Sequence, residues 1–444
     1  MSTLVWLRNN LRLHDNRCIT EAAASDHLLI VFIFPERICG HTPTGFRRTG
    51  PFRAAFLIES VKDTARKVGE LGGAMVVYRG DPATILGNLC DTHAVDRVIL
   101  PEEAGTEEGE EEAAVAAQLP PSVQITRVHD DVMYRPADLP FPPDSIPDVF
   151  SDFRRAVEAA SIIRAPLPTP TRLPPPPASF AREVAAAGAG DGPGVPTVFE
   201  LSGSEEQAPD PRGMRFDGGE TAGLARLKQY IWETEAVASY KKTRNGFVGR
   251  DYSSKLSPWL AVGALSPRTV SAELARFERH RMQNESTYAL RFELTWRDYF
   301  FYLAKKYGRR LFALSGPANR YRPWSRDEES FAGWCAGSTG EQIVDAAMRE
   351  LSLTGYTGNR ARQIVASYLA RDMGLDWRMG AEYFESLLVD YDPASNYGNW
   401  TYTVGVGTDP RKDRYFNPRK QAERYDPDGT FRDLWLGGGQ LALF

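Results

Sequence analysis

The chain has 444 residues, 42% of them hydrophobic and 25% charged, so we expect a globular protein of about two or three domains. Its net charge of −5 excludes a globally basic nucleic-acid binder, and its 4 cysteines form no CxxC pair, which argues against a structural zinc site or a disulfide scaffold. No apolar run approaches the roughly 20 residues that span a bilayer, and no signal or transit peptide precedes the first apolar segment, so we expect no membrane partner and a cytoplasmic location, or an organelle if a transit peptide was removed.

Residues 1–130 predict a doubly wound, Rossmann-like α/β domain with a parallel sheet. Short apolar runs typical of buried parallel strands alternate with segments of helical periodicity. Strands are expected at 4–7, 28–34, 75–78 and 98–100, and helices at 52–71 and 82–90. No GxGxxG follows the first strand and no GxxxxGK[ST] occurs, so the usual dinucleotide and P-loop fingerprints are absent. The acidic run 107–112 is interpreted as a solvated helix face.

Residues 131–219 are rich in Pro, Gly, Ala and Ser, and we interpret them as a long interdomain connector on the surface. A polyproline run at 174–177 and a low-complexity, flexible stretch at 185–194 support this reading, with a short helix expected at 153–160. From 220 to 444 the pattern is helical and strand signals are absent. Helices are expected at 221–238, 266–281, 288–307, 340–351, 359–371 and 377–388.

The stretch 355–418 carries the strongest functional signal. We interpret 398–402 and the acidic turn 390–392 before it as a polar, aromatic loop shaped by a flat, redox-active ring. No histidine follows His280, which excludes histidine-based catalysis and His-rich metal sites from this region. Basic segments with interleaved aromatics at 240–244, 320–324 and 411–415 suit a phosphate backbone with stacked bases, and three of them in one domain favour nucleic acid.

Two predicted helices place polar side chains on one face. Asn359 and Gln363 are four residues apart, and Glu293 lies three and four residues before Trp296 and Arg297. Taken alone, a Glu near a Trp on a helix is more often a buried, hydrogen-bonded acid than a catalytic group.

Several long motifs together resemble the photolyase/cryptochrome superfamily, and specifically its cryptochrome-DASH branch. The matching segments are 7–12 with 15–16, 138–141, 146–150, 243–246, 251–260, 292–294 and 296–300, together with the stretch 355–418. The resemblance extends over most of the chain and implies an all-helical, FAD-binding C-terminal domain behind an α/β antenna domain.

The resemblance also implies the roles of individual residues. FAD would contact Tyr240, Ser253, Ser254, Lys255, Leu256, Ser257, Glu293, Arg297, Asn359, Arg362, Asp390, Asp392 and Asn396. Trp400, Trp377 and Trp324 match the tryptophan chain that reduces the flavin, and three ordinary core tryptophans are the alternative. Glu293, Asn359, Trp296, Arg360, Gln363 and Tyr402 match the pocket for a flipped pyrimidine dimer.

The implied activity is that of a deoxyribodipyrimidine photo-lyase, a light-driven carbon–carbon lyase in which excited reduced FAD gives an electron to a cyclobutane pyrimidine dimer. Tyr402 and Gln363 are DASH-like and imply a preference for single-stranded DNA. The alternatives are a blue-light photoreceptor that signals through flavin photoreduction, and a flavin-free nucleic-acid binder. A (6–4) photolyase is disfavoured, because Asn359 and Gln363 stand where that branch has histidines.

Three departures from the family pattern bear on these expectations. Ala289 stands where a tryptophan is usual beside the flavin, and 356–358 replaces a bulkier run. The segment 101–105 only loosely matches the antenna site, with Glu103 as the expected ligand of a methenyltetrahydrofolate antenna. We expect a monomer without a bound metal.

Overall fold

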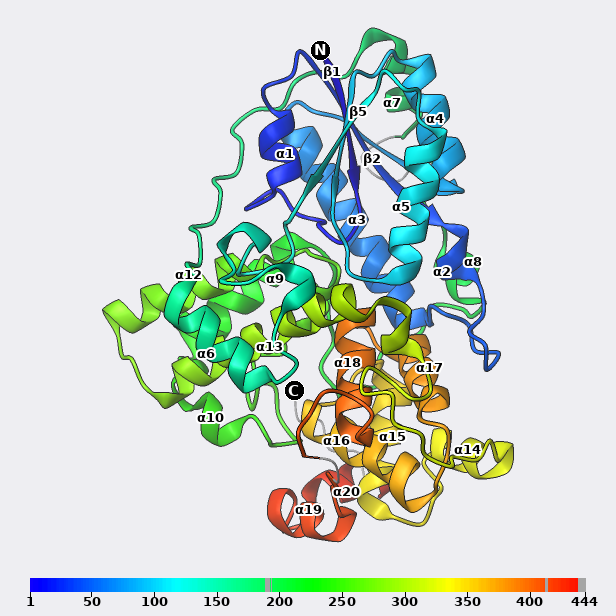
Figure 1. Cartoon of the computed structure of the whole chain (residues 1–444), viewed down its shortest axis with the longest axis vertical. Coiled ribbons are helices and arrows are strands. Elements are labelled where there is room, and N and C mark those ends of the chain that lie inside the picture. The colour runs from blue at the N-terminus through cyan, green and yellow to red at the C-terminus, as the bar shows by residue number, and fades with distance from the viewer. Residues whose placement is uncertain (188–191, 193, 412–413, 438–444) are drawn as a thin grey trace.

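The computed structural model describes residues 1–187, 192, 194–411 and 414–437. The predicted α/β unit is confirmed (Figure 1). Its five strands are β1 Ser2–Leu7, β2 His27–Pro35, β3 Met75–Gly80, β4 Arg97–Pro101 and β5 Gln124–Val128. They form one parallel sheet in the order β3-β2-β1-β4-β5, so the chain reverses its direction of winding between β1 and β4.

Alternating side chains of the sheet build two separate cores. Val5, Ile30 and Phe32 point to the face covered by α1 (Arg17–Ala22) and α3 (Pro51–Glu70). Trp6 and Val31 point to the opposite face, which α4 (Pro82–Thr92) and α5 (Thr106–Gln118) cover. This alternation is what a parallel sheet between two helical layers requires. The sequence prediction missed β5, because it is a partly exposed edge strand without a continuous apolar run.

Residues 131–219, the predicted connector, contact both the α/β unit and the helical half of the chain. Leu173 bonds to α3 through Leu71, and the backbone N–H of Gly218 donates to Glu59 on the same helix. It contains α6 Phe150–Ala160, α7 Ala181–Ala187 and α8 Val198–Ser202. The short helix expected at 153–160 is confirmed within α6. The stretch 185–194 is only partly described, and its first three residues end α7 rather than forming flexible chain.

The C-terminal half is helical, and the described residues after Gly219 form no strand beyond one isolated bridge. Its helices are α9 Glu220–Lys228, α10 Tyr240–Thr243, α11 Ser257–Ala261, α12 Pro267–His280, α13 Glu285–Tyr307, α14 Glu328–Cys335, α15 Gln342–Thr354, α16 Asn359–Ser367, α17 Trp377–Leu387, α18 Pro393–Val404, α19 Pro418–Tyr425 and α20 Thr430–Leu436. The predicted helices at 221–238 and 359–371 are shorter, because each passes into a π-helical turn, Gln229–Glu233 and Tyr368–Asp372. None of the helices in the described ranges is long and apolar enough to cross a membrane.

One prediction was wrong: residues 398–402 are not a loop but the middle of α18. Asp392 caps the helix by accepting the N–H of Ser395 at 2.6 Å, Pro393 occupies its first turn, and Gly405 ends it in the left-handed conformation. These are strong helix start and stop signals. The aromatic and polar residues of this segment therefore lie on a rigid helix that faces the core.

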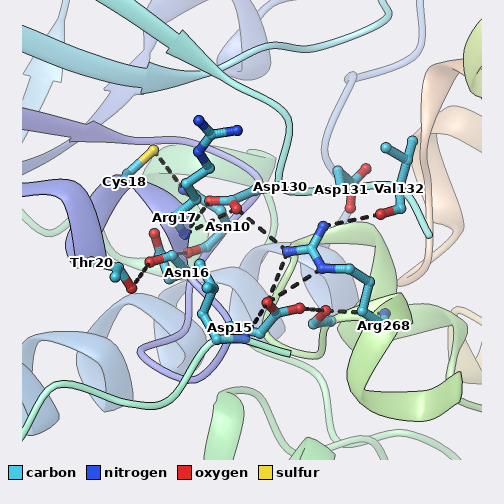
Figure 2. Close-up of polar contacts among 12 residues, drawn as sticks. Asn10, Asp15, Asn16, Arg17, Cys18, Thr20, Asp130, Asp131, Val132 and Arg268 are labelled. Atoms are coloured by element: carbon cyan, nitrogen blue, oxygen red, sulfur yellow. Dashed lines mark hydrogen bonds and ion pairs between the residues drawn. The ribbon is translucent and has the colours of Figure 1, made fainter. Parts of the chain in front are cut away.

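A buried ionic network joins the two halves of the molecule (Figure 2). Arg268 of α12 donates to Asp15 at 2.9 Å, lies 3.7 Å from Asp130, and donates to the carbonyl of Val132 at 3.1 Å. All three charged side chains are fully buried. Burial raises the pKa of Asp15, but the Arg268 guanidinium outweighs it and holds that pKa below its usual value. The motif at 15–16 thus serves the interface between the α/β and helical parts.

Candidate functional site

The predicted site residues gather where α13, α16 and α18 meet the loop before α11. Helix α18 packs against α13, α16 and α17, and α16 packs against α15. Polar residues reach this region from the loop 249–257, from the turn before α18 and from the α/β half of the chain.

The loop 250–257 is built to receive an anion. Arg226 of α9 donates to the carbonyl of Ser254 at 3.0 Å and to that of Ser253 at 3.2 Å, and it pairs with Asp251 at 2.7 Å. Lys255 has a positive φ of 51°, which curls the loop. Within the described part of the chain, the N–H groups of Ser253 and Ser254 have no protein acceptor. Backbone donors turned away from their own carbonyls in this manner bind phosphate groups.

A buried acid–base pair lies beneath this loop. Lys255 donates to the carbonyl of Gly249 at 2.9 Å, and burial lowers its pKa to about 8. Glu350 of α15 accepts from Thr357 at 2.5 Å, and burial raises its pKa to about 7, although Thr357 and Lys255 oppose the rise. Sequence reasoning identified Lys255 but missed Glu350 and Arg226, which carry no local motif.

Two arginine–carboxylate pairs form the polar wall. Arg362 holds both oxygens of Asp390, at 3.0 and 2.9 Å, and donates to the carbonyl of Thr357 at 2.8 Å. Arg297 pairs with Asp131 at 2.5 Å and donates to the carbonyl of Leu260 at 3.1 Å. Burial raises the pKa of Asp131 to about 6, and the Asp392 carboxylate contributes to the rise. Asp131 was not predicted, because it lies in the connector, far from Arg297 in sequence.

One oxygen of this wall has no donor. Asp131 Oδ1 is buried and without a hydrogen-bond partner in the described part of the chain, as is the hydroxyl of Tyr252. Buried polar atoms are seldom left unsatisfied, and an exception is explained by a missing ligand or water. Asn396 of α18 donates through its side-chain nitrogen to the carbonyl of Ala381 at 3.0 Å, which leaves its oxygen to accept from a ligand. Tyr240 is buried on α10, and Ser257 opens α11.

The three predicted relay tryptophans belong to one aromatic core. Trp400 and Trp377 are buried there, and Trp324 packs against it while partly exposed. Trp377 meets Tyr397 of α18 at 6.1 Å between ring centroids, and Trp324 donates to the carbonyl of Ala370 at 3.2 Å. A fourth indole, Trp334 on α14, contacts Trp400 at 6.4 Å. Sequence reasoning missed Trp334, which has no distinguishing neighbours.

The predicted substrate residues form an aromatic corner with charged edges. Trp296 of α13 meets Tyr402 of α18 edge to face at 5.2 Å. The ring of Phe150 of α6 stacks on Trp296 at 3.6 Å and 10°, and the rings of Tyr299 and Phe300 lie 5.6 and 5.3 Å from it. The hydroxyl of Tyr402 accepts hydrogen bonds from Arg411, at 2.9 Å, and from Arg414.

The remaining substrate residues lie around this corner with different contacts. Glu293 is ion-paired with Arg244 rather than buried alone. Arg360 donates to Asn245 at 2.8 Å, so the motif 243–246 connects α13 to α16. Asn359 is exposed at the start of α16, and Gln363 is half-buried one turn further on. Of the three predicted basic segments, 411–415 contains residues 412 and 413, which lie outside the described residues.

Glu103, the predicted antenna ligand, lies just after the carboxyl end of β4. It accepts the N–H of Asn9 at 3.1 Å and lies 3.4 Å from Arg8, and burial raises its pKa to about 7. The acidic run on the neighbouring helix α5, predicted to be a solvated face, is solvated only in part. Glu107 and Glu110 are exposed, whereas Glu108 and Glu111 turn inward and pair with Arg37 at 3.0 and 3.8 Å. The described residues contain no cluster of His, Cys, Asp or Glu that could hold a metal ion.

The comparisons with known proteins agree with this geometry. The family described as DNA photolyase matches residues 3–175, and the FAD binding domain of DNA photolyase matches residues 290–439. A cryptochrome DASH of Gloeobacter violaceus is 45% identical over 98% of this chain and 85% of the relative. A chloroplastic/mitochondrial cryptochrome DASH of rice is 44% identical over 98% of this chain and 76% of the relative.

Solved structures extend the comparison. The Synechocystis cryptochrome structure matches with a TM-score of 0.92 and 41% identity, covering 98% of this chain and 89% of the other. A bacterial class III photolyase from Agrobacterium tumefaciens matches with a TM-score of 0.79 and 27% identity, covering 98% and 86%.

Proposed function

Since the chain belongs to the photolyase/cryptochrome family, in its cryptochrome-DASH branch, we propose that it is a light-driven lyase that repairs cyclobutane pyrimidine dimers, preferentially in single-stranded DNA. The observation that supports this most directly is the aromatic corner of Trp296 and Tyr402 with the Glu293–Arg244 pair at its edge. It offers a flat apolar surface and adjacent hydrogen-bonding groups, which the two linked bases of a flipped pyrimidine dimer need.

FAD is the proposed cofactor, and the residues of the site fit it. The curled loop at Ser253 and Ser254 would hold the pyrophosphate, and Asp131, Asp390 and Asn396 would accept from the polar edges of the ring and ribityl chain. Arg362, Arg297 and Lys255 keep these carboxylates and the loop in place. The further proposed contacts are Tyr240, Leu256, Ser257, Glu293, Asn359 and Asp392. When bound, FAD would supply light absorption and one-electron chemistry.

For the substrate, we propose that Trp296 and Tyr402 contact the dimer and that Glu293, Asn359 and Gln363 bind its base edges. Arg360 would contact a phosphate. Extruding the dimer costs a few kcal/mol from a duplex and less from a single strand. Tyr402 offers less stacking surface than a tryptophan, and its hydroxyl already accepts hydrogen bonds from Arg411 and Arg414. Weaker stacking favours the single-stranded substrate, from which the dimer is extruded at a lower free-energy cost.

Trp324, Trp377 and Trp400 are proposed to carry electrons from the surface to the flavin site. Their common core and the graded exposure, from buried Trp400 to partly exposed Trp324, support this role. Methenyltetrahydrofolate is the proposed antenna, with Glu103 as its ligand: a pterin edge could replace the long contact of that carboxylate with Arg8. We further propose a monomer that acts in the cytoplasm or in an organelle.

The test is illumination of the reduced, FAD-bound protein with a dimer-containing oligonucleotide, either single-stranded or annealed to its complement. We expect faster repair of the single strand, and a loss of at least tenfold in Glu293→Gln and in Trp296→Ala at unchanged flavin occupancy. If the protein binds FAD but repairs neither substrate, the lyase activity is contradicted. Light-driven flavin reduction without repair would then remain, which is the property of a photoreceptor.

A further inference from the structure

A row of aromatic rings leaves the proposed dimer pocket along α13. Trp296, Phe292 and Tyr288 are spaced four residues apart, so they follow one face of the helix. The ring of Phe292 lies 6.3 Å from that of Tyr288 and 5.1 Å from that of Phe150, which in turn stacks on Trp296. The row therefore runs without a gap from the pocket to the surface.

The outer ring of this row is exposed yet held in place. Tyr288 is 40% exposed, and its hydroxyl donates to Glu158 at 2.8 Å and accepts from Arg154 at 2.7 Å. Arg154 also bonds to Glu158 at 2.8 Å, which closes a three-membered network between α13 and α6. An exposed ring that has already lost its rotational freedom can bind a partner at a small entropic cost.

Positive charge lies near the row. The guanidinium of Arg154 lies 5.8 Å from the centroid of the Phe292 ring. Helix α10, which packs against α13, carries Lys241 and Lys242, both exposed. Lys241 pairs with Glu285 at 2.8 Å, an exposed contact that a phosphate can replace. Stacking surfaces bordered by cations are the usual features of a single-strand binding groove.

We propose that the row Trp296, Phe292 and Tyr288 is the track of the undamaged flank of a single-stranded DNA whose dimer occupies the pocket. The inference rests on the proposed function and adds where the strand runs. Eight helical residues span about 12 Å, the length of three to four stacked nucleotides at about 3.4 Å each. The outermost base stacks on Tyr288, and Arg154 and the lysines of α10 contact phosphates. In a duplex the flanking bases are paired and cannot use the track.

A purely structural role for Tyr288 predicts something different. If the ring only fastens α6 to α13, its hydroxyl matters as much as its ring. Tyr288→Phe keeps the ring and loses both hydrogen bonds, whereas Tyr288→Ala loses both ring and bonds. Phe199 of α8 is a matched control, since it is also aromatic and 55% exposed but lies in the connector, away from this face.

The test measures dissociation constants of the FAD-bound full chain by fluorescence anisotropy. Three oligonucleotides are compared: a single strand with flanks on both sides of the dimer, a dimer with no flanking nucleotides, and the flanked strand annealed to its complement. We expect Tyr288→Ala to weaken binding of the flanked single strand about fivefold or more. Tyr288→Phe and Phe199→Ala should stay within about twofold of the wild type.

The proposal is overturned if Tyr288→Ala weakens the flankless dimer or the duplex as much as the flanked strand, or if Tyr288→Phe behaves like Tyr288→Ala. Melting temperatures of all variants check that the fold is intact. Repair under light is measured separately at a saturating concentration of oligonucleotide. If the wild-type protein binds flanked strands through Tyr288 but repairs nothing, the lyase activity is refuted and the proposed DNA track is retained.

Discussion

At the scale of single residues, burial sets the protonation of the carboxyl groups near the site. Burial is the largest cause that raises the pKa of Asp131 to about 6, of Asp298 to about 7 and of Glu350 to about 7. Asp298 on α13 is fully buried and accepts the N–H groups of Met133 and Tyr134 at 3.1 and 2.8 Å, which oppose the rise. These carboxyls take up protons close to neutral pH.

The first prediction concerns Asp298. Its pKa is higher in the folded protein than the ordinary value of 3.8, so between about 4 and about 7 the folded state binds more protons than the unfolded state. The stabilisation from this proton is complete below about pH 4 and is lost as the pH rises to about 7, by at most about 1.4 kcal/mol per pH unit. In Asp298→Asn, the free energy of unfolding from denaturant titrations should therefore fall less steeply across this range.

Asp81→Asn is the control for this measurement. Asp81 caps α4, and its hydrogen bonds from Thr84 lower its pKa, so it titrates below that window and should leave the slope unchanged. An unaltered pH dependence in Asp298→Asn would show that the carboxyl is already charged in the folded state at low pH.

The second prediction concerns the relay. Trp377 is the proposed intermediate step between buried Trp400 and partly exposed Trp324, which share its core, whereas Trp334 touches Trp400 but has no proposed role in the relay. In Trp377→Phe we expect light-driven reduction of bound FAD by a thiol to slow at least tenfold, as followed by the loss of flavin absorbance. Trp334→Phe should retain most of the rate. Equal rates in both variants would exclude Trp377 as an obligatory step.

At the scale of elements, the contact between α17 and α18 fixes the position of Trp400. A Cβ added at Gly380 of α17 would lie 2.3 Å from the Trp400 indole and 2.8 Å from a methyl group of Leu369. The absence of a side chain at this one position therefore lets the indole pack directly on the backbone of α17. The two helices could not approach as closely with any other residue there.

Gly380→Ala should consequently destabilise the protein, even though alanine is the better helix former. The intrinsic gain of about 1 kcal/mol is outweighed by overpacking against two large buried side chains, which costs about 1–3 kcal/mol or more. A lower denaturation midpoint and an altered Trp400 fluorescence would check this.

Gly109→Ala provides the opposite case. Gly109 lies inside α5 and a Cβ there would meet nothing within 4 Å, so the variant should be more stable by about 0.5–1 kcal/mol. If both variants shift stability in the same direction, packing against Trp400 is not the deciding factor at Gly380.

At the scale of the whole molecule, buried charged side chains hold the α/β and helical halves together. Arg268 lies between Asp15 and Asp130 (Figure 2). Arg12, from the same loop as Asp15, donates to the carbonyls of Gly263 and Asp130 at 2.7 and 2.9 Å. A buried ion pair of this kind stabilises the fold little more than apolar residues of similar size would. Removing only one partner, however, leaves a buried charge uncompensated.

Arg268→Met should therefore destabilise the protein by about 3–5 kcal/mol, measured by chemical denaturation, and should open the connector to proteolysis. The exposed pair of Arg155 and Asp152 on α6, at 2.5 Å, is the matched control, and Arg155→Met should change stability by less than about 1 kcal/mol. A mild effect of Arg268→Met would mean that water reaches the two aspartates.

Much of the fold was predictable because its signals are local. The three inner strands and the first half of the edge strand β3 are apolar, and the predicted helices between 52 and 388 follow the 3.6-residue period, so each was found near its observed place. The edge strand β5 was missed because its residues are half exposed. Helix α18 was missed because its polar residues interrupt the apolar pattern, although Asp392, Pro393 and Gly405 mark its ends.

The sequence by itself determined the two-part architecture, the family and the residue types of the proposed flavin and dimer sites, since these depend on local patterns and contiguous motifs. Only the tertiary structure decided the partners: Asp131 for Arg297, Arg226 for the loop at Ser253, and Arg411 and Arg414 for Tyr402. These contacts join segments that the packing of whole helices and sheets brings together. The sequence around a charged or aromatic side chain does not indicate which distant group that side chain will contact.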